Sequence, residues 1–377
     1  MTSQHSKHLH ATHGIVCHLP DAQLGYFGWP SVARMDDGTL VVASSGLRQW
    51  HICPWGKVVI NTSRNNGVTW SPPRIIRDTP IDDRDSGVIS LGGSRLLVAT
   101  FSSDPRPFVD ETAAAPELRA QWREPLSVLT DEIVKPHVGS WILLSDDAGA
   151  TWSAPIAAPA SAPHGPILLR SGRLLYFGKD ARDMYTASII AAASDDGGRN
   201  WHTLSEVPIP VGTVAANYHE PHLVELPSGQ LIGLIRLENA RPSDQTGGDL
   251  SRAGLTHFSI MQTESTDGGL TWTTAHPTTH SHGAPPHVIR HSSGALVCVY
   301  SHRLEPFGQR AMLSYDDGMS WEGDWVIRAD GPTWDLGYPA SVELPDGSIF
   351  SVYYQQVRVG EPCAILWSHW RLPQRSA

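Results

Sequence analysis

The sequence predicts an all-β protein folded as a six-bladed β-propeller, and three observations support this fold class. Gly (34 residues), Pro (29) and Trp (14) are abundant, whereas only 18% of the 377 residues are charged. This composition favours short strands joined by turns over long helices. A turn template occurs five times along the chain, and a strand–turn–strand pattern occurs six times. Repeats of this kind are typical of sheets arranged radially around an axis.

The turn template is S-x-D-x-G-x-x-W, and one of its copies has Asn in place of Asp. In a hairpin, the Asp or Asn oxygen accepts hydrogen bonds from backbone N–H groups two or three residues further on. Gly adopts a positive φ at low cost, and Trp packs over the turn as the next strand begins. We therefore interpret these side chains as structural rather than catalytic or calcium-binding. The copies begin at Ser63, Ser145, Ser194, Ser265 and Ser314.

The second pattern is an alternating apolar strand, a polar turn with Gly and another strand, which indicates a β-hairpin. Its six copies cover residues 29–45, 86–101, 164–178, 220–236, 285–301 and 338–354. Five copies are followed by the turn template, so each unit has four strands, as a propeller blade does. The last copy lacks the template. We expect the early run 14–20 (GIVCHLP) to pair with another blade and close the ring.

Residues 14–377 are therefore expected to form a single propeller domain, and the polar, His-rich residues 1–13 a disordered tail. Insertions interrupt the repeats near 102–139 and 238–256, and the first contains a helix-like stretch over 112–124. We expect both to project from one face, where propellers often carry specificity. The four cysteines form no CxxC pair and are expected to be buried thiols.

The net charge of −10 argues against general binding to nucleic acids, which requires a basic surface. It is compatible with an anionic small substrate held in a local basic pocket. The start of the chain lacks the apolar segment of a secretory signal, and no apolar run reaches the roughly 18 residues of a membrane span. We therefore expect a cytoplasmic location, unless a leader was removed, and no membrane partner.

Side chains at the starts of the innermost strands of a propeller converge on one end of its central channel. A purely structural ring favours small or apolar groups there, so acids, histidines and a tyrosine indicate a site. A metal held by three of the histidines is an alternative, but no HxH or HxxxH spacing supports it. We expect neither a metal nor another cofactor. The convergent residues are Trp29, Asp85, His164, His219, Glu220, His287 and Tyr338.

The turn templates and the strand starts resemble the sialidase superfamily of Asp-box (BNR-repeat) propellers over nearly the whole chain. The phrase 337–344 (GYPASVEL) is similar to the phrase that carries the tyrosine of that family, and it aligns Tyr338 with this residue. The phrase 219–223 (HEPHL) aligns Glu220 with the family's glutamate. The resemblance implies that Tyr338 is the nucleophile and that Glu220 helps to remove its proton.

The resemblance also implies that Arg236 and Arg310 bind an anionic group of the substrate, because both align with arginines of the family. A third family arginine is absent: Trp29 follows Gly28 at that place, and we expect it to contact the sugar by stacking. The family's acid/base aspartate is also absent, because residues 45–62 contain no Asp and His51 is the proton carrier in this stretch.

These residues together predict an exo-acting glycoside hydrolase, sialidase-like but not a typical sialidase, that acts on an anionic or hydroxyl-rich sugar. His51, His164 or Asp85 would supply the proton to the leaving group, and His219 and His287 would contact the substrate. One alternative is a polysaccharide lyase or a rhamnosidase-type enzyme that uses His, Tyr and Arg. Another is a non-catalytic carbohydrate-binding propeller. A carbohydrate is the expected partner in each case, and the sequence leaves the oligomeric state open.

Overall fold

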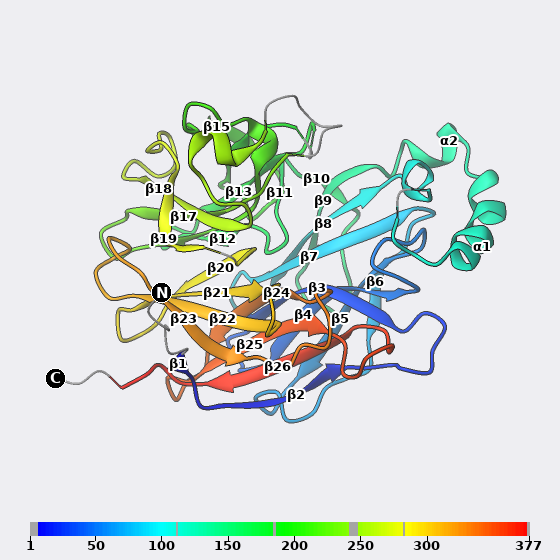
Figure 1. Ribbon diagram of the computed structural model, residues 1–377, viewed down its shortest axis with the longest axis horizontal. Helices are drawn as coiled ribbons and strands as arrows, with labels where there is room; N and C mark the ends of the chain where they lie inside the picture. The colour runs from blue at the N-terminus through cyan, green and yellow to red at the C-terminus, as the bar shows by residue number, and fades with distance from the viewer. Residues whose placement is uncertain (1–6, 111, 184–185, 241–247, 282, 375–377) are drawn as a thin grey trace.

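The computed structural model describes residues 7–110, 112–183, 186–240, 248–281 and 283–374, and it arranges six β-sheets in chain order around a centre (Figure 1). The innermost strand of the last sheet packs against the innermost strand of the first, so the ring is closed. The predicted all-β, six-bladed propeller is therefore confirmed. The architecture follows from the repeats, since each four-stranded unit buries its apolar faces only against its neighbours.

Each blade is an antiparallel meander that runs outward from the centre. Blade 1 contains β3 (Tyr26–Arg34), β4 (Leu40–Arg48), β5 (Lys57–Ser63) and β6 (Arg74–Arg77). Blade 2 contains β7 (Asp82–Ser90), β8 (Leu96–Ser103), β9 (Gly139–Ser145) and β10 (Ile156–Ala157). Blade 3 contains β12 (Ile167–Leu168), β13 (Leu174–Asp180), β14 (Ile189–Ser194) and β15 (His202–Glu206), and β11 (Ala160–Ser161) also pairs with β13.

Blades 4 to 6 follow the same plan. Blade 4 contains β16 (Tyr218–Glu225), β17 (Leu231–Leu237), β18 (Ser259–Ser265) and β19 (His276–Ser281). Blade 5 contains β20 (Pro286–Arg290), β21 (Leu296–His302), β22 (Gly308–Ser314) and β23 (Glu322–Arg328). Blade 6 contains β24 (Gly337–Glu343), β25 (Ile349–Gln355) and β26 (Ala364–Trp370). Short 3-10 helices cover Arg106–Phe108, Ala215–Asn217 and Leu250–Ala253.

The turn template forms the predicted hairpin, and the serine has a role that the sequence did not suggest. After β9, Ser145 Oγ donates to Asp147 Oδ1 (2.8 Å) and accepts from the backbone N–H of Gly149 (2.8 Å). Asp147 Oδ1 also accepts from the N–H of Thr151, four residues on, and Trp152 Nε1 donates to the Gly149 carbonyl. Every polar group in the turn thus finds a local partner, which explains why the template recurs.

The N-terminal segment closes the ring, as predicted for residues 14–20. Strand β2 (Ala11–Cys17) pairs antiparallel with β26 and completes blade 6. The expected disordered tail over 1–13 is wrong for residues 7–13, because β1 (Lys7–His8) pairs with β23 and β2 already begins at Ala11. Both strands cover sheet edges whose N–H and C=O groups would otherwise be unpaired. Residues 1–6 lie outside the described residues.

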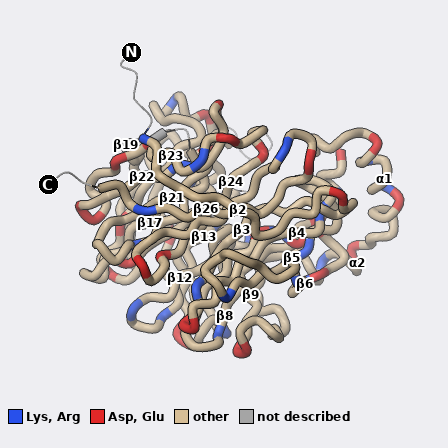
Figure 2. The backbone as a smooth tube through the Cα atoms, turned by 90° about the horizontal axis from the view of Figure 1, so that it is seen from below, with Lys and Arg blue, Asp and Glu red and all other residues tan. Residues whose placement is uncertain are grey.

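The insertion after β8 folds into two helices that project at the periphery of the propeller, α1 (Pro116–Ser127) and α2 (Asp131–Val134) (Figures 1 and 2). The helix predicted over 112–124 is thus present, shifted by about one turn. Its buried residues Trp122 and Leu126 pack on Cys53, in the loop between β4 and β5. The insertion therefore braces the loop between β4 and β5.

Acidic and basic residues are intermingled along the backbone in the view of Figure 2, without one region that is basic only. Within the described ranges, no helix has the length and apolar character needed to span a bilayer. All four cysteines are buried and free, as predicted.

Candidate active site

Four of the six innermost strands share a backbone irregularity near their start. Trp29, Asp85, Glu220 and Tyr338 have positive φ angles of 51°, 47°, 47° and 50°, and the strand register shifts beside each of them. A non-glycine residue pays about 1–3 kcal/mol in this region. Because the four residues occupy the same place in their blades, their side chains lie at the same end of the propeller. Local strain recurring at equivalent positions is a mark of a functional site.

Tyr338, Glu220 and Arg236 form one hydrogen-bonded group at this end. The Tyr338 hydroxyl donates to Glu220 Oε1, and Arg236 Nη1 donates to Glu220 Oε2 (2.5 Å) and to the Tyr338 oxygen (3.3 Å). Arg236 reaches this group because it faces His219 across the β16–β17 pair. The sequence predicted that Glu220 and Arg236 of blade 4 would meet Tyr338 of blade 6, and the structure brings the three residues together.

Burial sets the charge states of this group. Desolvation, reinforced by the Glu220 carboxylate, holds the pKa of Tyr338 well above its usual value, while Arg236 opposes the shift. Arg236 also donates to Glu238 Oε2 (2.6 Å). Burial alone would raise the pKa of Glu238, but Arg236 and His219 together outweigh burial and lower this pKa to about 2. Tyr338 is therefore a neutral phenol whose proton already points at a carboxylate, which is the resting state expected of a tyrosine nucleophile.

Asp85 is a second acid at the same end of the propeller. Burial raises its pKa to about 7, with Arg84 opposing the shift and Glu220 adding to it. The Asp85 charge also contributes to the raised pKa of Tyr338, so the two groups sense each other's charge. A carboxyl group with this pKa is protonated in part of the molecules at neutral pH and can act as a proton donor.

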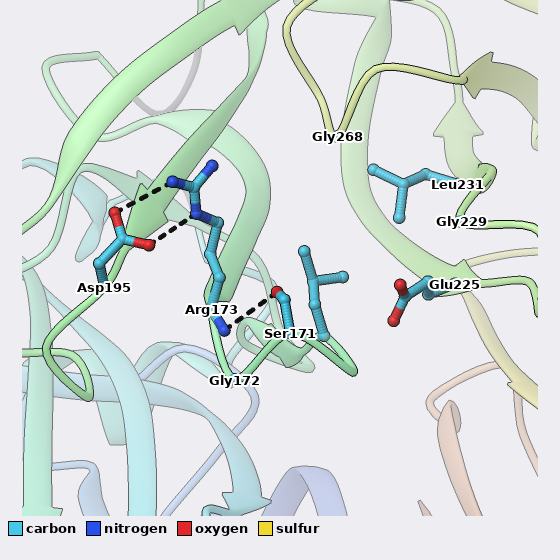
Figure 3. Close-up of a pocket in the computed structure, with 9 residues that line it drawn as sticks. Ser171, Gly172, Arg173, Asp195, Glu225, Gly229, Leu231 and Gly268 are labelled. Atoms are coloured by element: carbon cyan, nitrogen blue, oxygen red, sulfur yellow. Dashed lines mark hydrogen bonds and ion pairs between the residues drawn. The ribbon is translucent and has the colours of Figure 1, made fainter.

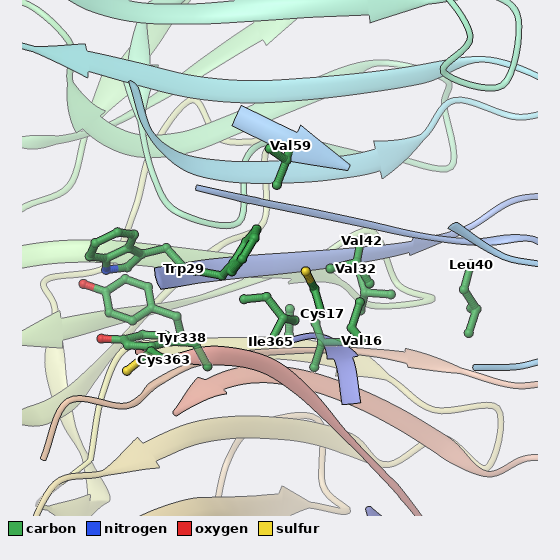
Figure 4. Packing of buried hydrophobic residues seen from close by; sticks show 14 of the residues in the cluster. Val16, Cys17, Trp29, Val32, Leu40, Val42, Val59, Tyr338, Cys363 and Ile365 are labelled. Carbon is green, nitrogen blue, oxygen red and sulfur yellow. The ribbon is translucent and has the colours of Figure 1, made fainter. Parts of the chain in front are cut away.

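Trp29 is buried and lies close to two guanidinium groups. Arg48 lies 4.9 Å and Arg84 4.6 Å from the ring centroid, and only 1% of the residue is exposed. Trp29 and Tyr338 stand together at one end of the buried cluster drawn in Figure 4. This packing leaves no free indole face, so the predicted stacking of a sugar on Trp29 is wrong. Its role is to support Arg84 by a cation–π contact beside the site.

His51 occupies the loop after β4 and is held by an aspartate from blade 6. Its Nδ1 lies 2.9 Å from Asp335 Oδ1, and the Tyr26 hydroxyl donates to both Asp335 oxygens (3.1 Å each). The His51 ring meets Trp29 edge-on at 4.9 Å between centroids. Desolvation lowers the pKa of His51; Asp335 opposes this, and Arg84 and Arg303 add to it. His51 thus lies beside Trp29, at the same end of the propeller as Tyr338, and its role as a proton carrier stays a prediction.

His164 and His287 lie deeper, along the axis, rather than at the mouth. Only 1% and 6% of these residues are exposed, and their rings pack against each other at 4.8 Å and against His222. His222 and His287 each accept a backbone N–H of the next blade at Nδ1. Desolvation by burial lowers the pKa of all three rings. The predicted catalytic role of His164 and substrate contact of His287 are therefore wrong, because protein encloses both.

His222 and His287 do not present a free nitrogen lone pair to a metal ion. Since Nδ1 of His222 and of His287 accepts an N–H, the proton of each neutral ring stays on Nε2, which leaves no lone pair there for a metal. Across the described part of the chain, no three His, Cys, Asp or Glu residues are arranged to hold a metal ion.

Two predicted substrate contacts, His219 and Arg310, are hydrogen-bonded to backbone carbonyls, and an arginine that was not predicted lies beside Tyr338. His219 Nε2 is bonded to the Ala216 carbonyl (2.7 Å), and Arg310 donates to the carbonyls of Arg328 (3.1 Å) and Pro306 (3.3 Å). Arg303 instead lies 5.8 Å above the Tyr338 ring. The family phrase pointed to Arg310, whereas Arg303 follows β21 in a stretch without any repeat signal.

Sequence reasoning missed four residues of this region. Arg84, Arg303 and Asp335 lie outside the repeated phrases, whereas His222 lies within the phrase 219–223, two residues after Glu220. Asp335 stands three residues before Tyr338, so proximity to the tyrosine phrase was the one signal available for it.

A hollow of about 480 Å³ lies elsewhere, between the 169–173 turn of blade 3 and the 225–231 turn of blade 4 (Figure 3). Arg173 and Asp195 form an ion pair across part of it, with Glu225 on the other side. Glu225 follows Glu220 by five residues along β16, which separates them by about 16 Å. This hollow is therefore at the opposite end of the strands from Tyr338.

The repeats and the ring have counterparts in known proteins. The BNR repeat-like domain matches residues 56–351. The chain belongs to this family. A sialidase of Vibrio cholerae is 25% identical to this BNR-repeat protein over 176 residues, which are 41% of the chain. The chain covers only about a fifth (21%) of the length of that relative.

Solved structures share the fold of this BNR-repeat protein at low sequence identity. A Dyadobacter fermentans protein of unknown function has a TM-score of 0.72 at 22% identity, with 96% of this chain and 99% of the other covered. Trypanosoma rangeli sialidase in complex with sialic acid has a TM-score of 0.62 at 14% identity, with 96% and 59% covered. A trans-sialidase from Ruminococcus gnavus has a TM-score of 0.62 at 16% identity, with 95% and 97% covered. The fold is thus a sialidase-like propeller.

Proposed function

We propose that this protein is an exo-acting glycoside hydrolase with Tyr338 as its nucleophile. The observation that supports this most is the hydrogen-bonded group of Tyr338, Glu220 and Arg236, built from two blades around a strained backbone. The similarity to a sialidase of Vibrio cholerae agrees with it. A structural role alone would not require a buried phenol to donate its proton to a carboxylate that an arginine also holds.

In the first step, Glu220 takes the phenolic proton as the Tyr338 oxygen bonds to the anomeric carbon. The bond from that carbon to the leaving-group oxygen breaks, and this oxygen receives a proton. Asp85 and His51 are the candidate donors of this proton, because both lie at the same end of the propeller as Tyr338. In the second step, water attacks the same carbon and gives one proton to the group that protonated the leaving oxygen, while the Tyr338 oxygen leaves and Glu220 returns the phenolic proton to it. The covalent intermediate thus replaces one difficult displacement with two easier ones.

Two arginine side chains place positive charge beside the tyrosine. Arg236 contacts the phenol oxygen, and Arg303 stacks on the Tyr338 ring. Within the described residues, Arg303 has no carboxylate partner: its Nε donates to the Leu336 carbonyl and its Nη2 to the Tyr354 hydroxyl. A guanidinium left without a carboxylate favours an anionic group on the substrate. We therefore propose an anionic sugar as substrate, with a hydroxyl-rich sugar as the second class to test.

The test is hydrolysis of a panel of aryl glycosides that includes sialosides, uronides and rhamnosides. Tyr338→Phe and Glu220→Gln should each lower kcat/KM by about a hundredfold or more, because each removes part of the nucleophile. A fluorinated glycoside should add its sugar mass to the peptide that carries Tyr338. The matched control is Tyr353→Phe, which removes a buried hydroxyl that contacts Ser368 on blade 6 instead.

Three outcomes would contradict the proposal. Unchanged turnover in both site variants would exclude Tyr338 and Glu220 from the reaction. An unsaturated product that absorbs in the ultraviolet would identify a lyase. Binding of sugar without turnover of any glycoside would identify a carbohydrate-binding propeller.

A further inference from the structure

His51 differs from Asp85 in where the fold places it. Asp85 belongs to β7, an innermost strand, at the level of Glu220 and Tyr338. His51 belongs to the loop between β4 and β5, outside the ring of innermost strands, beside Trp334, which is 54% exposed. In an exo-acting enzyme the terminal sugar fills the channel end and the leaving group extends outward. The loop residue, rather than the strand residue, is then beside the leaving group.

Asp335 fixes which nitrogen of His51 carries the proton. An ionised carboxylate only accepts hydrogen bonds, so the His51 nitrogen that lies 2.9 Å from Asp335 Oδ1 must be Nδ1–H. Asp335 is itself held by the hydroxyls of Tyr26 and Tyr354. His51 Nε2 has no hydrogen-bond partner among the described residues, and 24% of the side chain is exposed. In this arrangement Nε2 of His51 is free to exchange a proton, while the carboxylate of Asp335 holds the opposite nitrogen.

A second anchor holds the His51 loop from the side of the insertion. Gln49 Oε1 accepts hydrogen bonds from Nε1 of Trp55 (3.0 Å) and of Trp122 in α1 (2.6 Å). Arg48 Nη2 donates to the backbone carbonyl of His51 (3.1 Å) and is itself paired with buried Asp82. The loop is therefore fixed at its backbone, at its side chain and through Gln49, which is the support expected of a catalytic group.

We infer that His51 is the proton carrier for the leaving group and that Asp335 is its positioning residue; the inference rests on the proposed hydrolase function. In the first step, the His51 imidazolium passes its Nε2 proton to the departing oxygen as the Tyr338 oxygen bonds to the anomeric carbon. In the second step, neutral Nε2 takes a proton from the attacking water, which restores the imidazolium. Asp335 keeps Nδ1–H in place and stabilises the positive ring in both steps.

The charged and titratable groups around His51 give this role a measurable signature. Asp335 favours the protonated ring, and Arg84 and Arg303 disfavour it. Tyr26 is a neutral phenol here, because burial, together with Asp335, raises its pKa well above the usual value. Removal of the Asp335 charge should therefore make His51 harder to protonate and should move its titration to lower pH.

The experiment is the pH dependence of kcat/KM for the wild type and Asp335→Asn, together with ¹⁵N NMR titration of the histidines, with His51→Gln identifying the His51 signals. The wild type should show Nδ1–H and lose activity on the alkaline side with the pKa of His51. Asp335→Asn should move both the NMR pKa and the alkaline limb to lower pH by about one unit or more. At neutral pH this corresponds to a loss of about tenfold in kcat, with KM little changed.

Two further variants keep the test decisive. Tyr354→Phe removes one hydrogen bond from Asp335 but keeps its charge, so it should move the alkaline limb of the pH profile slightly to higher pH. This variant replaces Asp335→Asn in the test if Asp335→Asn does not fold. Asp346→Asn removes an exposed carboxylate that pairs with Arg371 on the turn of blade 6, and it should leave the profile unchanged.

The outcomes separate the two proposals. The inference is overturned if the limb and the His51 titration stay in place in Asp335→Asn and Tyr354→Phe, or if only Asp85→Asn moves the limb. If the wild type hydrolyses no glycoside, the proposed function fails instead. The NMR titration then still decides whether Asp335 controls the protonation of His51.

Discussion

Acidification should destabilise this propeller through the histidines on its axis. His164, His222 and His287 are buried as neutral rings, and burial lowers the pKa of His222 from 6.5 to about 4. In the unfolded chain a histidine binds a proton with a pKa of about 6.5. Below this pH the unfolded chain therefore takes up protons that the buried rings of the folded state do not bind. Above pH 6.5 these rings are neutral in both states, and the free energy of unfolding is at its full value. It decreases as the pH falls from 6.5 towards 4.

The magnitude follows from the pKa difference. Each pKa unit corresponds to about 1.4 kcal/mol, so at pH 5 the single group His222 lowers the free energy of unfolding by about 2 kcal/mol. His164 and His287 act in the same direction, because burial lowers their pKa values well below 6.5. A loss of about 2 kcal/mol is therefore the minimum expected from the cluster, against a total stability of about 5–15 kcal/mol for a typical domain.

Urea unfolding at several pH values between 7 and 5, followed by tryptophan fluorescence, measures this loss. His222→Gln removes the titrating group, so the variant should be less stable at pH 7 but should lose about 2 kcal/mol less than the wild type on acidification. His202→Gln, at an exposed position on β15, is the control. Equal pH dependence in the wild type and His222→Gln would refute the reasoning, since carboxylate titration is common to both.

Three further predictions concern other parts of the structure. Asp82→Asn should lower the free energy of unfolding by about 3–5 kcal/mol in urea titrations, because it leaves Arg48 buried without its partner carboxylate at 2.6 Å; a loss below about 1 kcal/mol would contradict this. Deletion of residues 1–17 should expose the edge of β26 and cause self-association in light scattering, whereas a monomer of unchanged stability would show that β2 is dispensable. Arg236→Lys should lower kcat/KM by about tenfold or more while the unfolding midpoint changes little, because one ammonium cannot reach Glu220, Glu238 and Tyr338 together; near-wild-type turnover would remove Arg236 from the substrate site.

The fold was predictable because its signals are local. Each turn template binds its own backbone through groups within four residues, as Ser145, Asp147 and Thr151 do, and each hairpin pairs strands adjacent in sequence. Such signals repeat unchanged around the ring, so counting them gives the number of blades. The pairing of β2 with β26 was also predictable, since only an early strand was left to complete the last blade.

The site was predictable only where it coincided with the repeats. Tyr338, Glu220 and Asp85 stand at equivalent blade positions, so the repeat itself aligned them. Arg236 followed from the register of the β16–β17 hairpin. His164 and His287 satisfied the same rule but are enclosed on the axis, because depth along a channel depends on how neighbouring blades pack.

From the sequence alone came the number of blades, the turn chemistry and the meeting of a tyrosine with a glutamate, because these depend on short-range hydrogen bonds and strand periodicity. Only the tertiary structure decided which cations and proton carriers join them. Asp335 and His51 are 284 residues apart and come from different blades. Their contact depends on the paths of two loops, which no local sequence pattern encodes. The same is true of the arginine beside Tyr338, which is Arg303 and not Arg310.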